Sequence, residues 1–383
     1  MRLKDYTEII LVCFAGLIYE ALVVWAAFNC EPLVYVLDCI VIMYWVFIIK
    51  KETRKRKEED EMRIINTHTG KIYVDEERQL EFLTVGDYGK ENNIKADFLG
   101  LHKEINGVEN KPVDLSKKWV ATISTQKGCP MKCKFCDCPK YGFHGNASLE
   151  DLKYEIEKIL KGESTKYTDR FNVHFARMGE PTFNIDVIFF ARDELKPLVE
   201  KYITAKTIHP VVSTMLPKNN PHLDLFLRAW CRVKNRWYGG EAGLQFSINS
   251  TDDKQREEQF SGMSLSLDEI SKIARGLPDP VGRKYTLNFA VTADTIIDPV
   301  RLGELFSKDK FIVKITPIHE TNSAVQNGFD VSTTYTDYDV YRKFEQPLVD
   351  AGWDVIVFVP SKEEDSDRIT CGNALISAGN MEV

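Results

Sequence analysis

The 383-residue sequence has no excess of positive charge and little glycine or proline. Its 50 Lys+Arg stand against 57 Asp+Glu, a net charge of −7, and it contains 22 Gly and 15 Pro. So little glycine excludes a collagen, and nine cysteines in so long a chain exclude a disulfide-rich miniprotein. A mean hydropathy of −0.26 excludes a polytopic transporter, and 44% hydrophobic residues exclude a disordered chain. The length suits one large α/β domain with an appendage.

Two nearly uncharged hydrophobic segments, residues 9–28 and 33–49, lie close to the N-terminus. At a rise of about 1.5 Å per residue, each is long enough to cross a hydrocarbon core of about 30 Å as a helix. The segment KKETRKRK (50–57) follows with six cations in eight residues, which is typical of the cytoplasmic side. The sequence therefore predicts a transmembrane helical hairpin over residues 1–50, located in a membrane with both chain ends cytoplasmic and the lipid bilayer as partner. A cleaved signal peptide is the alternative for the first segment, but the second apolar segment argues against it.

The remaining chain divides into three parts. Residues 51–61 form a charged linker, and the short alternating segments between Gly and Asn over residues 62–117 predict a small β-rich cap. Residues 118–383 alternate apolar strands with amphipathic helices, which predicts parallel βαβ units in an α/β barrel or open partial barrel. Chemistry in such a fold belongs at the C-terminal ends of the strands. The predicted strands are 119–124, 171–177, 207–213, 244–249, 285–291, 311–317 and 353–359, and the predicted helices include 149–161, 184–202, 267–276 and 300–308.

A cysteine motif follows the first predicted barrel strand. Cys129, Cys133 and Cys136 are spaced C-x3-C-x2-C in one loop. Three closely spaced thiolates suit an iron–sulfur cluster in which one iron keeps an open position for substrate or cofactor. The alternative is a structural zinc site with Cys138 as the fourth ligand. Cys231, in an apolar and aromatic run, is interpreted as a packing residue.

This motif resembles the signature of the radical S-adenosylmethionine (SAM) enzymes. The resemblance implies a partial (β/α)6 barrel and a [4Fe–4S] cluster on Cys129, Cys133 and Cys136, whose free iron binds SAM. It also implies an electron donor of the flavodoxin or ferredoxin kind, because one electron cleaves SAM to the radical that abstracts hydrogen from a substrate. Further residues resemble the SAM-holding positions of these enzymes and lie at successive strand ends: Gly179 and Glu180 of a Gly-Glu-Pro motif, Ser213, Ser247, Asn249 and His319.

One subgroup is the most similar. The blocks QKGCPMKCKFC, RMGEPTFN, VVSTMLP, LQFSINSTDD, KITPIH and RITCGNAL occur in the order found in the RlmN/Cfr group of RNA adenine methyltransferases, over about residues 118–375. The resemblance implies that Cys371 is a catalytic methyl carrier, whereas a buried structural cysteine is the alternative. It also implies that Glu109, at about the spacing of that group's carboxylate, acts as a base.

The sequence departs from this group in three ways. The second family cysteine corresponds to Thr122, and a threonine hydroxyl cannot replace a thiol as disulfide partner or as a base near neutral pH. Cys138 is an extra thiol that could substitute for it. His319 stands where the group has a SAM-contacting asparagine. The acidic net charge argues against an RNA substrate, because phosphate contacts dominate nucleic-acid affinity.

Three hypotheses follow from these observations. The first is a membrane-anchored radical SAM methyltransferase that uses Cys371 as methyl carrier, with adenine of RNA as one substrate. The second is a radical SAM enzyme of another reaction type that acts on a metabolite, lipid or peptide near the membrane. The third is an inactive iron–sulfur module for binding or sensing. Thr122 is the residue that separates the first hypothesis from the second.

Overall fold

The structure is a computed structural model, and it describes residues 43–45, 47–48, 62–86, 104–105, 108–109, 114–331, 338–360 and 362–378. The chain divides into two compact units, residues 1–61 and residues 62–383. The second unit contains one ten-stranded sheet and all the predicted site residues.

The structure contradicts the predicted membrane location. Of residues 1–50, it describes only two short helical pieces, 43–45 and 47–48, and the rest of the predicted hairpin lies outside the described residues. A helix needs about 20 consecutive apolar residues to span a bilayer. Within the described part of the chain, no helix combines that length with that apolar character.

Seven parallel strands form the main part of the sheet, in chain order from β6 to β14. Their bounds are β6 Lys118–Ile123, β9 Tyr167–Phe175, β10 Thr204–Thr214, β11 Gly243–Ser247, β12 Tyr285–Val291, β13 Phe311–Pro317 and β14 Val355–Val357. Each predicted barrel strand overlaps one of them. The α/β architecture with a parallel barrel sheet is therefore confirmed.

Three antiparallel strands extend this sheet beyond β6. They are β1 (Met62–Asn66), β2 (Gly70–Asp75) and β3 (Leu80–Gly86), and β3 pairs antiparallel with β6. Residues 62–86 thus continue the barrel sheet. Two small two-stranded sheets stand apart from it, β4 (Glu104–Ile105) with β5 (Val108–Glu109) and β7 (Gln126–Gly128) with β8 (Phe143–Asn146).

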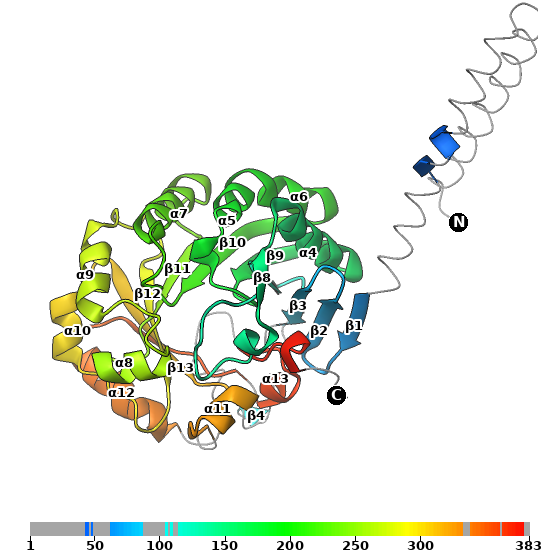
Figure 1. Ribbon diagram of the computed structural model, residues 1–383. Coiled ribbons are helices and arrows are strands. Elements are labelled where there is room, and N and C mark those ends of the chain that lie inside the picture. Colours follow the sequence, from blue (N-terminus) through cyan, green and yellow to red (C-terminus); the bar gives the residue numbers. More distant parts are fainter. Residues whose placement is uncertain are drawn as a thin grey trace, which may run out of the picture. The chain divides into compact units, whose positions relative to one another are not determined.

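Helices cover the outer face of the curved sheet (Figure 1). Two of them begin at capping boxes: Ser148 caps α4 with Asp151, and Ser266 caps α9 with Glu269, so side chains satisfy the first free N–H groups of each helix. The helices are α4 Leu149–Gly162, α5 Asp186–Phe189, α6 Leu195–Tyr202, α7 Leu223–Trp237, α8 Asp253–Gln259, α9 Leu267–Gly276, α10 Pro299–Leu305, α11 Asn322–Gln326, α12 Asp339–Asp350 and α13 Lys362–Ser366, with a π-helical segment at Phe190–Glu194 and 3-10 turns at Cys138–Tyr141, Pro181–Phe183 and Ile376–Ala378.

The two faces of the sheet differ in polarity. Along β9, Phe171, Val173 and Phe175 are buried in the main core beneath the helices, whereas Arg170 and His174 point to the opposite, inner face. The same alternation holds along the neighbouring strands. The main core therefore lies between sheet and helices, and the inner face of the sheet remains for a site.

Candidate cluster and SAM site

The cysteine motif lies in a loop that leaves β7 at its C-terminal end. Gly128 precedes the loop at φ +76°, and a Cβ there would lie 1.9 Å from the Gly142 carbonyl oxygen, so only glycine fits. The Cys129 N–H donates to that same carbonyl over 2.9 Å. This anchor fixes where the first cysteine enters the site.

The three thiols of Cys129, Cys133 and Cys136 are partly exposed. Burial and the neighbouring cysteines raise the pKa of Cys129 and of Cys133. A hydrogen bond with Cys138 lowers the pKa of Cys136, but burial and the nearby thiols outweigh it, and the net shift is upward. Thiolates crowded together in this way need a positively charged partner, which a bound iron centre supplies.

The residues present fit a cluster and a polar ligand. Within the described residues, no three His, Cys, Asp or Glu side chains are arranged to hold a single metal ion. Each thiolate of a [4Fe–4S] cluster binds a different iron, so its three sulfurs are spaced more widely than the ligands of one ion. In addition, the buried Asn249 Nδ2 and Asn288 Oδ1 atoms have no hydrogen-bond partner among the described residues. Buried polar atoms are normally satisfied, so these two indicate a polar ligand on the inner face.

Gly179 and Glu180 lie four and five residues after the end of β9 at Phe175. Gly179 has φ +98°, and a Cβ there would lie 2.6 Å from the side chain of Gln126. The Glu180 carboxylate is buried and accepts hydrogen bonds from the Thr182 hydroxyl (2.7 Å) and the Met215 N–H (3.0 Å). Burial raises the pKa of Glu180. The carboxylate is thus held firmly at the edge of the site, beside the start of the cluster loop.

Ser213, Ser247 and Asn249 lie at the C-terminal ends of β10 and β11, the edge that the fold assigns to chemistry. Both serines are half-buried. Asn249 has φ +61°, and its Oδ1 accepts from the Ala290 N–H over 3.3 Å. The structure therefore brings these three side chains to the strand ends where the sequence predicted them.

The structure describes the side chain of His319 but not that of Glu109. His319 follows β13, and its Nδ1 lies 3.1 Å from Asp365 Oδ1 in α13. It therefore links the barrel to the C-terminal segment. Glu109 pairs with Glu104 in the β4–β5 sheet. The position of the Glu109 side chain lies outside what the structure describes, so its role as a base remains a prediction.

Cys371 lies beside the cluster loop. The Asp137 N–H, one residue after Cys136, donates to the Gly372 carbonyl over 2.9 Å. A Cβ on Gly372 would lie 3.5 Å from the Cys136 Cα. Cys371 is an exposed residue whose Sγ lies 3.8 Å from the Ala176 carbonyl oxygen. The surroundings of the thiol itself withdraw it from water, and this desolvation together with Cys138 raises its pKa to about 11. Residues 235 positions apart in sequence thus meet at one site.

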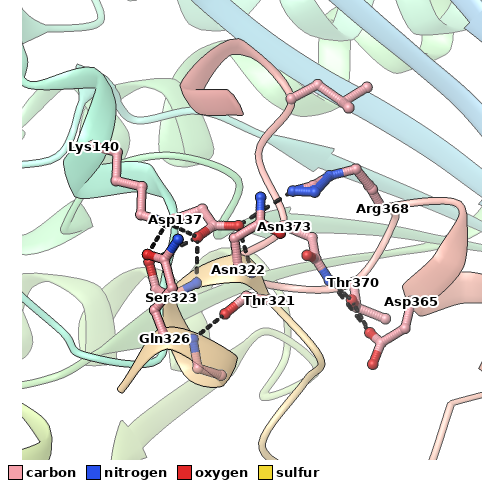
Figure 2. A network of polar contacts seen from close by, with 12 residues as sticks. Asp137, Lys140, Thr321, Asn322, Ser323, Gln326, Asp365, Arg368, Thr370 and Asn373 are labelled. Carbon is pink, nitrogen blue, oxygen red and sulfur yellow. Dashed lines mark hydrogen bonds and ion pairs between the residues drawn. The ribbon is translucent and has the colours of Figure 1, made fainter. Parts of the chain in front are cut away.

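Asp137 joins the cluster loop to two later segments (Figure 2). Its carboxylate accepts from the Ser323 N–H (2.8 Å) and hydroxyl (2.7 Å) at the start of α11. It also faces Lys140 at 3.0 Å and Arg368 at 3.3 Å. Burial alone would raise the pKa of Asp137, but the Ser323 and Lys140 hydrogen bonds lower it overall. The sequence analysis missed this residue, although an aspartate directly after the last cluster cysteine offered a signal.

A buried ion pair, also missed, holds the Cys371 segment to the sheet. Arg177 bonds to Glu81 of β3, and both side chains are almost fully buried. The Arg177 guanidinium also donates to the carbonyls of Arg368 (2.9 Å) and Thr370 (3.2 Å). Glu81 accepts from the Leu375 N–H over 3.1 Å. The only sequence signal was an arginine at the end of an apolar strand.

Cys138, the thiol that the sequence offered in place of Thr122, lies in a different part of the fold from Thr122. Thr122 lies in β6, paired with His174 of β9. Cys138 is buried against Met178 and Ala374, and its Sγ donates to the Arg177 carbonyl over 3.2 Å. The extra thiol therefore lies on the Cys371 side of the cluster loop.

Replacing Asp137 with asparagine is expected to lower the free energy of unfolding by about 1.5–3 kcal/mol, the range for lost hydrogen bonds to a buried charge. The amide loses the negative charge that faces Lys140 and Arg368. Urea denaturation of the full chain measures this. Asp169→Asn is the matched control, because that carboxylate bonds to Tyr167 on the surface. If Asp137→Asn and Asp169→Asn lowered the free energy of unfolding equally, the stabilising role assigned to Asp137 would be contradicted.

The fold is similar to that of the radical SAM class. The solved structure of a radical SAM methyltransferase from Sphaerobacter thermophilus aligns with 82% of this chain and 82% of its own length, with a TM-score of 0.50 and 15% identity, and supports the fold. No protein-family model matches the chain.

In sequence, the chain is similar to curated RNA methyltransferases named RlmN. It is 26% identical over 51% of its length to a probable dual-specificity RNA methyltransferase RlmN of Heliobacterium modesticaldum. It is 25% identical over 70% of its length to the protein of the same name in Petrotoga mobilis. The matches cover 49% and 71% of those relatives, so the chain spans about half the length of the first. The cofactors of the class, a [4Fe–4S] cluster and SAM, fit the residues described above.

Proposed function

We propose that the chain is a radical SAM methyltransferase in which Cys371 carries the methyl group. The observation that carries this proposal is the contact between the Cys371–Gly372 segment and the cluster loop, through the Asp137–Gly372 hydrogen bond. Cys129, Cys133 and Cys136 hold the cluster. Gly179, Glu180, Ser213, Ser247 and Asn249 line the SAM site, with His319 beside them.

When bound, the cluster and SAM supply the radical chemistry of this class. The chain's own residues fix where that chemistry acts. In the proposed first step, the Cys371 thiol would give up its proton and accept the methyl group that SAM supplies when bound. Burial raises the pKa of Cys371 to about 11, which opposes this step, whereas Arg177 and Lys314 favour the thiolate.

The substrate proposed from the RlmN relatives is an adenine base of RNA, and the proposed electron donor is a flavodoxin-like or ferredoxin-like protein. A second candidate function is a radical SAM reaction of another type. Thr122 of β6 favours this candidate, because the resemblance implies a cysteine at that position and a hydroxyl cannot replace its thiol. Cys138 lies on the Cys371 side of the cluster loop and is the only other described thiol there outside the three cluster cysteines.

Methyl-labelled SAM separates the two functions. The full chain is reconstituted anaerobically, reduced with labelled SAM and digested for mass spectrometry. The proposal predicts one labelled methyl on the Cys371 peptide and none in the Cys371→Ala variant. Cleavage of SAM to 5′-deoxyadenosine without any methylated peptide would favour the second candidate. The Cys231→Ala variant is the control, because Cys231 is buried in α7 among core residues.

A further inference from the structure

Helix α8 buries two polar side chains, whereas a surface helix ordinarily buries apolar ones. They are Arg256 and Gln259, and Arg256 is only 1% exposed. Burial lowers the pKa of Arg256 to about 10, so the guanidinium keeps its charge at neutral pH. A buried charge is costly unless hydrogen bonds satisfy it, so the partners of Arg256 indicate its role.

One guanidinium nitrogen of Arg256 holds the end of β11. Its Nη1 donates to the carbonyls of Ser247 (3.0 Å) and Ile248. The next residue is Asn249, which has φ +61° and whose N–H donates to the Asn288 carbonyl over 3.1 Å. Arg256 thus holds both carbonyls immediately before this left-handed residue and thereby orients the Asn249 side chain.

The other guanidinium nitrogen reaches the end of β10 through one hydroxyl. The Arg256 Nη2 donates to the Ser264 hydroxyl, which donates to the Met215 carbonyl over 2.8 Å. Met215 directly follows β10, and its N–H donates to the Glu180 carboxylate over 3.0 Å. A continuous series of contacts therefore runs from Arg256 to Glu180.

The C-terminal end of α8 contacts the cluster loop. The Lys134 N–H donates to the Gln259 carbonyl over 2.9 Å, and the Ser261 hydroxyl donates to the Lys132 carbonyl over 2.6 Å. Lys132 and Lys134 flank Cys133 in the sequence. One short segment thus contacts the cluster loop and, through Arg256, the ends of β10 and β11.

We propose that Arg256 is a positioning residue for SAM, which sets where Glu180 and Asn249 stand relative to the cluster loop and thereby how tightly SAM binds. The inference rests on the proposed function, because it concerns the same SAM site, but it does not require methyl transfer to Cys371. The planar guanidinium of Arg256 reaches acceptors on both strand ends at once. A lysine ammonium is a compact point charge and can replace it only in part.

Equilibrium binding of SAM to the reconstituted full chain, measured by anaerobic titration calorimetry, tests this role. Arg256→Met is expected to raise the dissociation constant by about tenfold, the effect of losing hydrogen bonds to a charged group. Arg256→Lys should raise it less. Ser264→Ala removes only the hydroxyl between Arg256 and Met215 and should raise it by about threefold. Iron content and visible absorption should stay at the wild-type level, so that weaker binding does not reflect a lost cluster.

Lys234→Met is the matched control. Lys234 is another fully buried cation on a helix, and its Nζ donates to the Val281 carbonyl over 2.5 Å. Val281 precedes β12, at the edge of the sheet opposite the SAM site. The control variant should lose thermal stability, as Arg256→Met does, but keep the wild-type dissociation constant for SAM. Where Arg256→Met does not fold, Arg256→Lys and Ser264→Ala decide.

The outcomes distinguish this role from the proposed function. Wild-type SAM binding in both Arg256→Lys and Ser264→Ala, or a loss in Lys234→Met as large as in Arg256→Met, overturns the positioning role. If Cys371 is still methylated in that case, the proposed function stands. The predicted order of dissociation constants without any methyl on Cys371 supports the positioning role and overturns the proposed function.

Discussion

Replacing Cys133 with alanine is expected to abolish the cluster's visible absorption and all SAM cleavage in the reconstituted chain. Cys133 lies in the middle of the motif, packed with Cys129, Phe135 and Met131. A three-cysteine site that loses one ligand leaves a second iron without protein attachment, and such clusters are held by their thiolates. Iron content and the visible spectrum after anaerobic reconstitution measure the effect.

Cys138→Ala is the matched control for this variant. Cys138 is a buried thiol two residues past the motif, and its Sγ donates to the Arg177 carbonyl. It should bind as much iron as the wild-type chain. If Cys133→Ala keeps its colour and SAM cleavage, or if Cys138→Ala loses as much iron as Cys133→Ala, the ligand assignment is wrong.

The second large effect concerns the buried Arg177–Glu81 pair. Replacing Arg177 with methionine should lower the free energy of unfolding by about 3–5 kcal/mol, because removing one partner leaves a buried charge uncompensated. The same change removes the guanidinium that donates hydrogen bonds to the carbonyls of Arg368 and Thr370. The segment that carries Cys371 should then exchange its amide hydrogens faster.

Urea denaturation and hydrogen exchange of the full chain measure these two effects. Arg192→Met is the control, because Arg192 pairs with Asp193 on the surface, where ion pairs contribute about 0–1 kcal/mol. The double variant Glu81→Gln with Arg177→Met should lose less stability than the sum of the single variants. A loss in Arg177→Met no larger than in Arg192→Met would show that the pair does not hold the C-terminal segment.

The sequence predicted the barrel strands well because their apolar residues follow a strict pattern. The predicted helices 149–161 and 267–276 were equally clear, since each is preceded by a serine that has an acid three residues later. The cysteine motif could also be found, because its ligands lie close together in one loop. The membrane prediction rested on the hydropathy of two segments and on the cationic segment 50–57, and the described residues contain no helix that could span a bilayer.

Other parts of the site depend on contacts that no local pattern reveals. Glu81 and Arg177 are 96 positions apart, and Asp137 and Arg368 are 231 apart. The fold alone brings them together. The polar inner face had a local signal, Arg170 and His174 four positions apart in β9, but only the packed helices show which face is inner.

EPR spectroscopy of the reduced, reconstituted full chain, with and without SAM, tests the central claim most directly. Three cysteine ligands leave one iron open for SAM. We therefore predict the signal of a reduced [4Fe–4S] cluster whose shape changes when SAM is added. A signal that SAM leaves unchanged, or a reconstituted chain that holds no iron–sulfur cluster, would contradict the assignment of the chain's function to radical SAM chemistry.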